Sequence, residues 1–395
     1  MDFNFDKVYK IPLRAMKINR CHPNIKRDMK WFIHFILNFS IFTMVFLLIM
    51  FNITLNLKNK EFDQTCKNGV LSVVYFVTSF QHFIMLWKQD ILLNLITLMK
   101  KDYEQAKSLS ICEQEIMYKY IKKGVYVCKQ WFVISCCACG IFPLKNLVLL
   151  TYQCLIGEPK LIPVYDLVYP GVIEENKNNI VVYLTIYAFL LFYGLYAMCM
   201  YTAFVPLGPV FMLHLCGQLE IVQKKIERVF EERVEIETRI KEFIVHLQRI
   251  YSFAEQILFC FRVNYELTLK ATTIILPITW YEVIEAFHKG DVPLEFITFF
   301  VGGILISSSP CYYSDLLMEK GESVRIAVYS NGWESVCEFK TLNTLKIILL
   351  RALRPVAIRT LFRTVCLEAL TDVSIFLYVS LIVTSSLSSQ PKDVQ

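Results

Sequence analysis

The chain has 395 residues, of which 55% are hydrophobic and only 19% are charged, whereas ordinary soluble domains carry roughly 25% charge. Together with a mean hydropathy of +0.45, this composition excludes a typical soluble globular protein. The 41 basic and 35 acidic residues leave a net charge of +6, an excess too small to indicate a nucleic-acid-binding protein. The composition therefore favours a membrane protein.

Seven segments are long and apolar enough to cross a bilayer as helices, because a hydrocarbon core of about 30 Å needs roughly 20 helical residues. In chain order they are 31–51, 69–87, 125–151, 180–216, 257–284, 294–313 and 361–385. The fourth is too long for one span, so it tilts, bends at Pro206 and Pro209, or continues as a helix beyond the membrane. The sequence predicts an all-α membrane protein with seven transmembrane helices.

Lys and Arg are distributed unevenly between alternate connections. The N-terminal segment 1–30 and the connections 88–124, 217–256 and 314–360 hold 29 of them, whereas 52–68, 152–179, 285–293 and the tail 386–395 hold 7. Because positive charge is retained on the cytoplasmic side, we expect a cytoplasmic N-terminus and an extracellular C-terminus. The sequon Asn52-Ile53-Thr54 then faces outward and is a weak candidate for glycosylation.

Two of the predicted cytoplasmic connections carry helical patterns. Between 217 and 256 an apolar stripe favours amphipathic extensions of spans four and five that pack on each other, with contact to another subunit as the alternative. In 314–360, Asn331-Gly332 predicts a turn, and a helix then follows until Pro355. One face of that helix holds Val336, Phe339, Leu342, Leu345, Leu349 and Leu353.

No nucleotide-binding, metalloprotease or other catalytic motif occurs, so we expect neither an enzyme nor a cofactor. Cys136 and Cys139 form a C-x-x-C pair in an apolar setting without a second pair, which does not predict a metal site. Arg262, Glu266 and Lys270 share a helix face, and we interpret them as an ion-pair ladder rather than an ion site.

Acidic and aromatic residues inside the spans suggest two further features. Glu368 and Asp372 in the final span should face protein or water, either as a cation-attracting pore lining or paired with Arg363. Many aromatic residues fall in the outer halves of spans two, four and six. Ordinary helix packing explains most of them, and a minority could line a small apolar pocket.

The last hundred residues resemble those of the insect odorant receptor family. The resemblance is carried, in order, by Pro310-Cys311-Tyr312, Tyr329-Ser330-Asn331-Gly332-Trp333, Arg354-Pro355, Leu367-Glu368 and Tyr378. The length, the seven spans and the large cytoplasmic region agree along the whole chain. The long insertion typical of the shared co-receptor is missing, so the chain is similar to an odour-tuning subunit.

The resemblance implies a subunit that binds small volatile hydrophobic ligands and joins the co-receptor in a heterotetramer. That complex would be a ligand-gated, non-selective cation channel in the plasma membrane, in sensory dendrites of olfactory neurons, with membrane lipid around it. By the same resemblance, odorant-pocket candidates are Ser72, Tyr75, Phe76, Cys139, Phe142, Tyr183, Ile186, Tyr187 and Phe299, and pore or gate candidates are Leu381, Ile382, Val383, Glu368 and Asp372.

Two other classes compete with this interpretation. A seven-helix G-protein-coupled receptor would need an outside N-terminus, an acid-Arg-Tyr triplet after span three and an Asn-Pro-x-x-Tyr motif in span seven. Neither motif is found, and the charge distribution predicts the opposite orientation. A membrane transporter would be expected to show inverted repeats or paired broken helices, and we detect neither.

Overall fold

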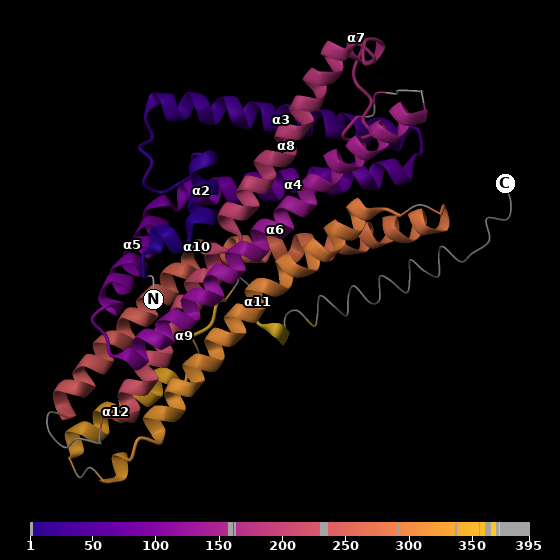
Figure 1. Cartoon of the computed structure of the whole chain (residues 1–395). Helices are drawn as coiled ribbons and strands as arrows, with labels where there is room; N and C mark the ends of the chain where they lie inside the picture. The colour runs from indigo at the N-terminus through magenta and orange to yellow at the C-terminus, as the bar shows by residue number, and fades with distance from the viewer. Residues whose placement is uncertain are drawn as a thin grey trace.

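The structure is a computed structural model that describes residues 3–156, 161, 163–229, 236–290, 292–335, 338–354, 356–359, 365–368 and 371. Every regular element within these ranges is a helix (Figure 1). They are α1 (Phe5–Val8), α2 (Lys10–Ile18), α3 (Met29–Lys58), α4 (Phe62–Trp87), α5 (Gln89–Ala106), α6 (Ile111–Ile156), α7 (Val172–Glu175), α8 (Ile180–Phe204), α9 (Leu207–Glu227), α10 (Ile236–His288), α11 (Leu294–Tyr329), the 3₁₀ turn η1 (Trp333–Ser335) and α12 (Phe339–Ala352).

The predicted spans correspond to longer helices. Five stretches are long and apolar enough to cross a membrane by length and composition: α3, α4, most of α6, α8 with α9, and α11. The fifth predicted span lies inside α10, whose middle carries Arg262, Glu266 and Lys270. The seventh, 361–385, lies almost wholly outside the described residues and stays a prediction.

Local sequence explains where several helices begin. The Asp28 carboxylate caps α3 by accepting a hydrogen bond of 2.8 Å from the Trp31 backbone N–H, and the Asn179 side chain caps α8 in the same way. Of the three alternatives for the fourth span, the structure shows a break at Pro206, because α8 ends at Phe204 and α9 starts at Leu207, whereas Pro209 lies inside α9. Proline fits there because it lacks the N–H that a continuing helix needs.

Helix α9 forms the centre of the molecule. Nearly every side chain from Leu207 to Val222 is buried, and the helix packs against α6, α10 and α11. The His246 ring bonds the Gln218 side-chain oxygen at 2.8 Å, joining α10 to α9. The interpretation of 217–256 as extensions of spans four and five that pack on each other is therefore confirmed for the described part of this connection.

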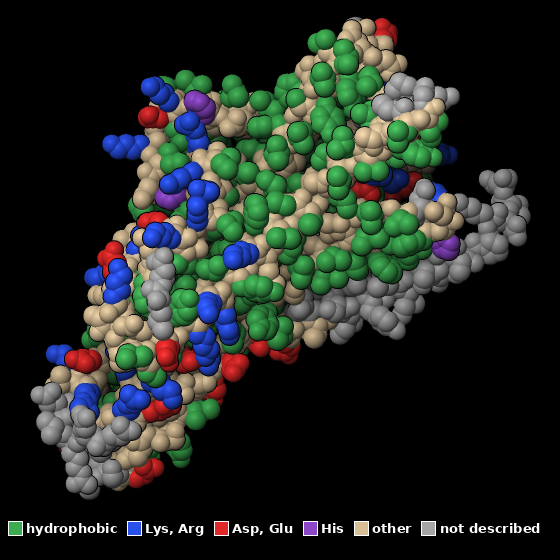
Figure 2. All heavy atoms as spheres, viewed as in Figure 1, with side chains coloured by type: hydrophobic (Ala, Val, Ile, Leu, Met, Phe, Trp, Pro, Cys, Tyr) green, Lys and Arg blue, Asp and Glu red, His purple; other side chains and the backbone are tan. Residues whose placement is uncertain are grey.

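Charge and apolar surface separate along the molecule (Figure 2). Hydrophobic side chains cover α3, α8 and the neighbouring helices, whereas Lys, Arg, Asp and Glu gather toward the end that holds α12. We call this the α12 end, and the opposite end the α7 end. Such a division suits a protein with one part in lipid and one in water.

The α12 region agrees only in part with the predicted amphipathic face. Gly332 has a φ of +80°, as the Asn331-Gly332 turn requires. Thr341, Leu345 and Ile348 are buried, while Phe339 and Leu353 at the two ends of α12 are exposed. The predicted apolar face is therefore only partly covered within this chain. Val336 and Pro355 lie outside the described residues.

Candidate functional site

A cavity of about 140 Å³ lies inside the bundle, enclosed by α4, α6, α8, α10 and α11. Its wall is almost entirely apolar and includes Val74 of α4, Trp131 of α6, Ala197 of α8, Ile275 of α10 and Ile306 of α11. Residues from five separate helices thus line one space. Concave, mostly apolar spaces of this kind hold small hydrophobic molecules.

Aromatic rings form one side of the cavity. The Phe142 ring meets Tyr165 edge-on at 5.1 Å between centroids and lies 5.8 Å from Phe299. The Tyr193 hydroxyl donates a hydrogen bond of 2.8 Å to the Leu71 carbonyl, which fixes α8 against α4. Because their neighbours hold these rings, the aromatic side of the cavity is preformed.

The polar groups of the wall are few. The Cys139 thiol bonds the Gly194 carbonyl at 3.2 Å, and the Thr272 hydroxyl bonds the Leu269 carbonyl at 2.9 Å. Ser135 and Thr268 add two buried hydroxyls. A ligand that matches this wall is mostly apolar and has one or two hydrogen-bonding groups.

Two adjacent glycines of α11 set the width of the cavity. A side chain at Gly302 would meet no atom within 4 Å, so this glycine leaves open space in the wall. A Cβ on Gly303 would instead stand 2.7 Å from the Leu276 Cδ2 atom. Gly303 therefore permits the close approach of α10 and α11, while Gly302 contributes volume.

Three of the nine predicted pocket residues, Cys139, Phe142 and Phe299, lie on this wall. Tyr75 does not, because its ring stacks on Phe46 at 3.9 Å and its hydroxyl bonds Thr43 at 2.9 Å, so it faces α3. The Ser72 hydroxyl bonds the Gly69 carbonyl of its own helix, and the Phe76 side chain is 56% exposed.

The remaining predicted pocket residues lie toward the α7 end of α8. The rings of Tyr183 and Tyr187 lie 5.9 Å apart, and neither residue lines the cavity. Ile186 lines a separate hollow between α3 and α8. The cavity residues that the sequence analysis missed include Tyr165, Tyr193, Gly194 and Gly302; small residues within apolar spans were the available signal for the two glycines.

Most of the pore candidates lie in the part of the chain that the structure does not describe. Leu381, Ile382, Val383 and Asp372 lie outside the described residues, and Glu368 is exposed. Among the residues that are described, no group of three or more His, Cys, Asp or Glu could hold a metal ion.

Two other predicted features are resolved in the described residues. The expected ion-pair ladder is present in part, since the Lys270 ammonium lies 2.9 Å from the Glu266 carboxylate.

The Asn52 side chain is 1% exposed. Its Nδ2 atom donates to the Leu48 and Val168 carbonyls at 2.9 Å, and its Oδ1 atom accepts from the Val168 N–H at 2.7 Å. A glycan on Nδ2 would disrupt these contacts, so the structure argues against Asn52 as a glycosylation site.

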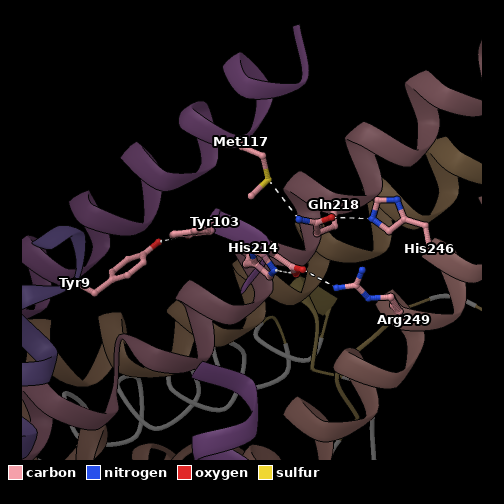
Figure 3. A network of polar contacts seen from close by, with 8 residues as sticks. Tyr9, Tyr103, Met117, His214, Gln218, His246 and Arg249 are labelled. Carbon is pink, nitrogen blue, oxygen red and sulfur yellow. Dashed lines mark hydrogen bonds and ion pairs between the residues drawn. The ribbon is translucent and has the colours of Figure 1, made fainter. Parts of the chain in front are cut away.

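Between the cavity and the α12 end, a partly buried polar network joins the helices (Figure 3). Asp102 of α5 accepts from His214 of α9 at 3.0 Å and from Arg249 of α10 at 2.6 Å. Burial alone raises the pKa of Asp102, but these two partners outweigh burial and lower it. The carboxylate thus stays charged and holds three helices together.

Further polar contacts lie near this network. Gln218 of α9 donates to the Met117 sulfur of α6 at 3.5 Å, and the hydroxyls of Tyr9 and Tyr103 lie 3.0 Å apart. Glu220, also on α9, accepts from Tyr120 at 2.6 Å and pairs with Lys320 of α11 at 3.1 Å. These partners outweigh the effect of burial and lower the pKa of Glu220 to about 2. These contacts hold α6 and α11 against α9 toward the α12 end.

The fold and the cavity define a multi-pass, all-α membrane protein with an internal apolar cavity. The family described as 7tm Odorant receptor matches residues 61–378, so the chain belongs to the odorant receptor family. This is a family of receptors rather than enzymes. A search of curated proteins found no match.

Two solved structures share this fold. The insect olfactory receptor OR5 from Machilis hrabei in complex with eugenol aligns with a TM-score of 0.77 at 12% identity, covering 96% of this chain and 98% of that one. The structure of the same receptor described without eugenol aligns with a TM-score of 0.71 at 14% identity, covering 94% and 96%. The predicted family and the all-α fold are confirmed.

Proposed function

We propose that this chain is the odour-tuning subunit of a ligand-gated cation channel, and that the cavity enclosed by α4, α6, α8, α10 and α11 binds its odorant. The observation that carries the proposal is that an enclosed apolar cavity with preformed aromatic rings occurs in a member of the odorant receptor family. The fold neighbour named in complex with eugenol supports a ligand of this kind, a small and mostly apolar molecule.

In this proposal the chain assembles with the shared co-receptor as a heterotetramer in the plasma membrane of the sensory dendrite. The charge distribution supports a cytoplasmic α12 end, since one set of connections holds 29 Lys and Arg residues and the alternate set holds only 7. The segments 1–30 and 314–360 would then be cytoplasmic, and 361–385 would line the pore. Glu368 and Asp372 would attract cations, and Leu381, Ile382 and Val383 would form an apolar gate.

The test is a current recording from cells that express the chain with the co-receptor, the co-receptor alone, or the chain alone, against a panel of volatiles. We expect odorant-evoked cation current only when both chains are present. Phe299→Ala, which opens the aromatic side of the cavity, should change the rank order of agonists. Leu147→Ala is a matched control, because Leu147 of α6 is 57% exposed and does not line the cavity.

Two results would contradict the proposal. Responses carried by a G-protein pathway in the absence of the co-receptor would assign the chain to another receptor class. An unchanged rank order in Phe299→Ala, at normal surface expression, would remove the cavity from odorant recognition.

A further inference from the structure

Three aromatic rings meet at one edge of the internal cavity, toward the connections 152–179 and 285–293. Phe142 is the last residue of α6 on the wall, and Phe299 follows Thr298, the first residue of α11 on the wall. Tyr165 comes from the connection between α6 and α7. Phe142 contacts both other rings, at centroid distances of 5.1 Å to Tyr165 and 5.8 Å to Phe299. The spacing of the rings therefore depends on how three segments of chain are held together.

An ion pair joins α6 and α11 just beyond these rings. The Lys145 ammonium lies 2.5 Å from the Glu295 carboxylate. Lys145 lies three residues after Phe142, and Glu295 lies four residues before Phe299. Residues at these spacings share a face of a helix. Roughly one helical turn thus separates each charged residue from its ring.

The Glu295 end of this ion pair is buried. Glu295 is 5% exposed, whereas the Lys145 side chain is 55% exposed and reaches the carboxylate from the surface. A buried carboxylate that loses its partner is strongly unfavourable, so the pair is maintained. It therefore fixes the first turn of α11 against α6.

A neighbouring contact of α6 holds the segment that carries Tyr165. Asn146, the residue after Lys145, is 7% exposed, and its Nδ2 atom donates a hydrogen bond of 2.7 Å to the Pro163 carbonyl. Tyr165 lies two residues farther along the chain and is itself buried. One short stretch of α6, residues 142–146, thus reaches both other segments that carry the rings.

Helix α6 has a proline, Pro143, within this same stretch. Proline has no backbone N–H, so the helical hydrogen bond to the Cys139 carbonyl is absent. Prolines inside helices are a common cause of kinks. The direction of α6 beyond Pro143 is therefore determined by its contacts with α11 and with residues 163–165, and not by its own hydrogen bonds alone.

We propose that Lys145, Glu295 and Asn146 are positioning residues, which set the spacing of the three aromatic rings and thereby the selectivity of the cavity. None of the three lines the cavity, so they act through the rings. This inference rests on the proposed function, because it takes the cavity as the odorant site. Aromatic rings interact best in defined relative orientations, so the selectivity between aromatic and aliphatic odorants is the property that these residues control.

The first experiment observes the rings without any odorant. Para-fluorophenylalanine replaces Phe299 in the full-length protein in phosphatidylcholine nanodiscs, and its fluorine NMR resonance is recorded. Glu295→Leu removes the ion pair and leaves Lys145 free to reach water, and it should shift or broaden this resonance. Lys145→Arg keeps the pair and should leave the resonance in place. Lys289→Gln is the matched control, because it breaks an ion pair with Asp63 that involves neither α6 nor α11.

The second experiment records currents with the co-receptor, using benzyl alcohol, phenylethanol and hexanol as probes. In Glu295→Leu, the ratio of half-maximal concentrations between the aromatic and the aliphatic alcohols should change roughly two- to tenfold, the effect of one aromatic contact. Asn146→Ala should also change this ratio. Lys145→Gln removes the same ion pair from its exposed side and keeps the test decisive if Glu295→Leu does not reach the surface. In a Phe299→Ala background, Glu295→Leu should add less than about twofold, because one ring through which it acts is gone.

Two results would overturn the proposal. Equal movement of the fluorine resonance in Lys289→Gln and Glu295→Leu would mean a general loosening of this end of the molecule. An unchanged ratio in Glu295→Leu, Lys145→Gln and Asn146→Ala, when Phe299→Ala does change it, would mean that these contacts only stabilise the fold. An unchanged ratio in Phe299→Ala itself would instead contradict the proposed function, and a shifted resonance in Glu295→Leu would still show that the ion pair holds the rings.

Discussion

Replacing Gly302 with leucine should fill the internal cavity and leave the fold intact. The new side chain meets open space, because no atom lies within 4 Å of the Cβ position. Its four carbons would extend from the Gly302 position on the cavity wall and take up part of the space that a ligand would use. Helix propensity also improves by about 1 kcal/mol when glycine is replaced in a helix interior.

The assay is a dose–response curve for odorants of increasing size, recorded with the co-receptor and normalised to surface expression. In Gly302→Leu, the half-maximal concentration should rise tenfold or more, because a pocket distinguishes ligands by roughly tenfold or more for each methylene that no longer fits. The effect should grow with ligand size. Gly302→Ala adds one carbon and should give a smaller shift in the same direction.

Gly303 provides the contrasting control. An alanine Cβ there stands 2.7 Å from Leu276 Cδ2, and Leu276 is itself buried, so either the Leu276 side chain changes its rotamer within the packed core or α10 and α11 move apart. Overpacking of this kind costs about 1–3 kcal/mol, and Gly303→Ala should lower surface expression. If Gly302→Leu reaches the surface and responds to every odorant as the parent does, the cavity is not the odorant site.

Three further predictions concern stability, orientation and the pore. Burial lowers the pKa of His246 to about 4, so the unfolded chain, with a His pKa near 6.5, binds more protons between pH 4 and 6.5. Stability should therefore fall by about 2 kcal/mol from pH 7.5 to pH 5, and His246→Gln should reduce this loss in thermal unfolding scans. An epitope tag after Gln395 should be accessible on intact cells, whereas one before Met1 should need permeabilisation; the reverse pattern would contradict the charge argument. Val383→Ser should raise ligand-independent current, and Glu368→Gln should shift the reversal potential more than the odorant preference; normal expression with neither change would exclude the final helix from conduction.

Five of the seven predicted spans correspond to helices that are long and apolar enough to cross a membrane, because each is an apolar run of about the required length. The sequence underestimated the extent of α6, which begins at Ile111 in polar sequence, where hydropathy falls but helix propensity remains. It located the α8–α9 break because Pro206 removes a backbone donor.

The cavity was harder to predict. Nearly all of α8 is apolar, so its composition does not show which side faces the cavity and which faces lipid. The resemblance and the outer-half positions predict Tyr75 and Tyr187 for the pocket, but the structure places both rings away from the cavity. The Asp102–His214–Arg249 contacts join residues more than thirty positions apart and depend on tertiary packing.

Helix α11 connects the cavity to the segment that precedes the proposed pore helix. From Gly302 on the cavity wall to Ser314 is about 18 Å of continuous helix, at 1.5 Å per residue. The Ser314 hydroxyl, fully buried, accepts a hydrogen bond of 3.2 Å from the Ile358 N–H. The Ile358 carbonyl in turn accepts from the Val365 N–H at 2.8 Å. A displacement of α11 by a ligand would thus reach the chain just before the final helix.

This contact can be tested separately from ligand binding. Ser314→Ala leaves the buried Ile358 N–H without its acceptor. This should destabilise the conformation in which residues 314 and 358 are in contact by about 1–3 kcal/mol. The ratio of odorant-evoked to basal current should therefore change severalfold, while the rank order of odorants stays the same, because Ser314 does not line the cavity. Ser309→Ala is the matched control, since the Ser309 hydroxyl has no partner among the described residues. If Ser314→Ala and Ser309→Ala give the same currents at equal expression, α11 does not transmit the signal through Ile358.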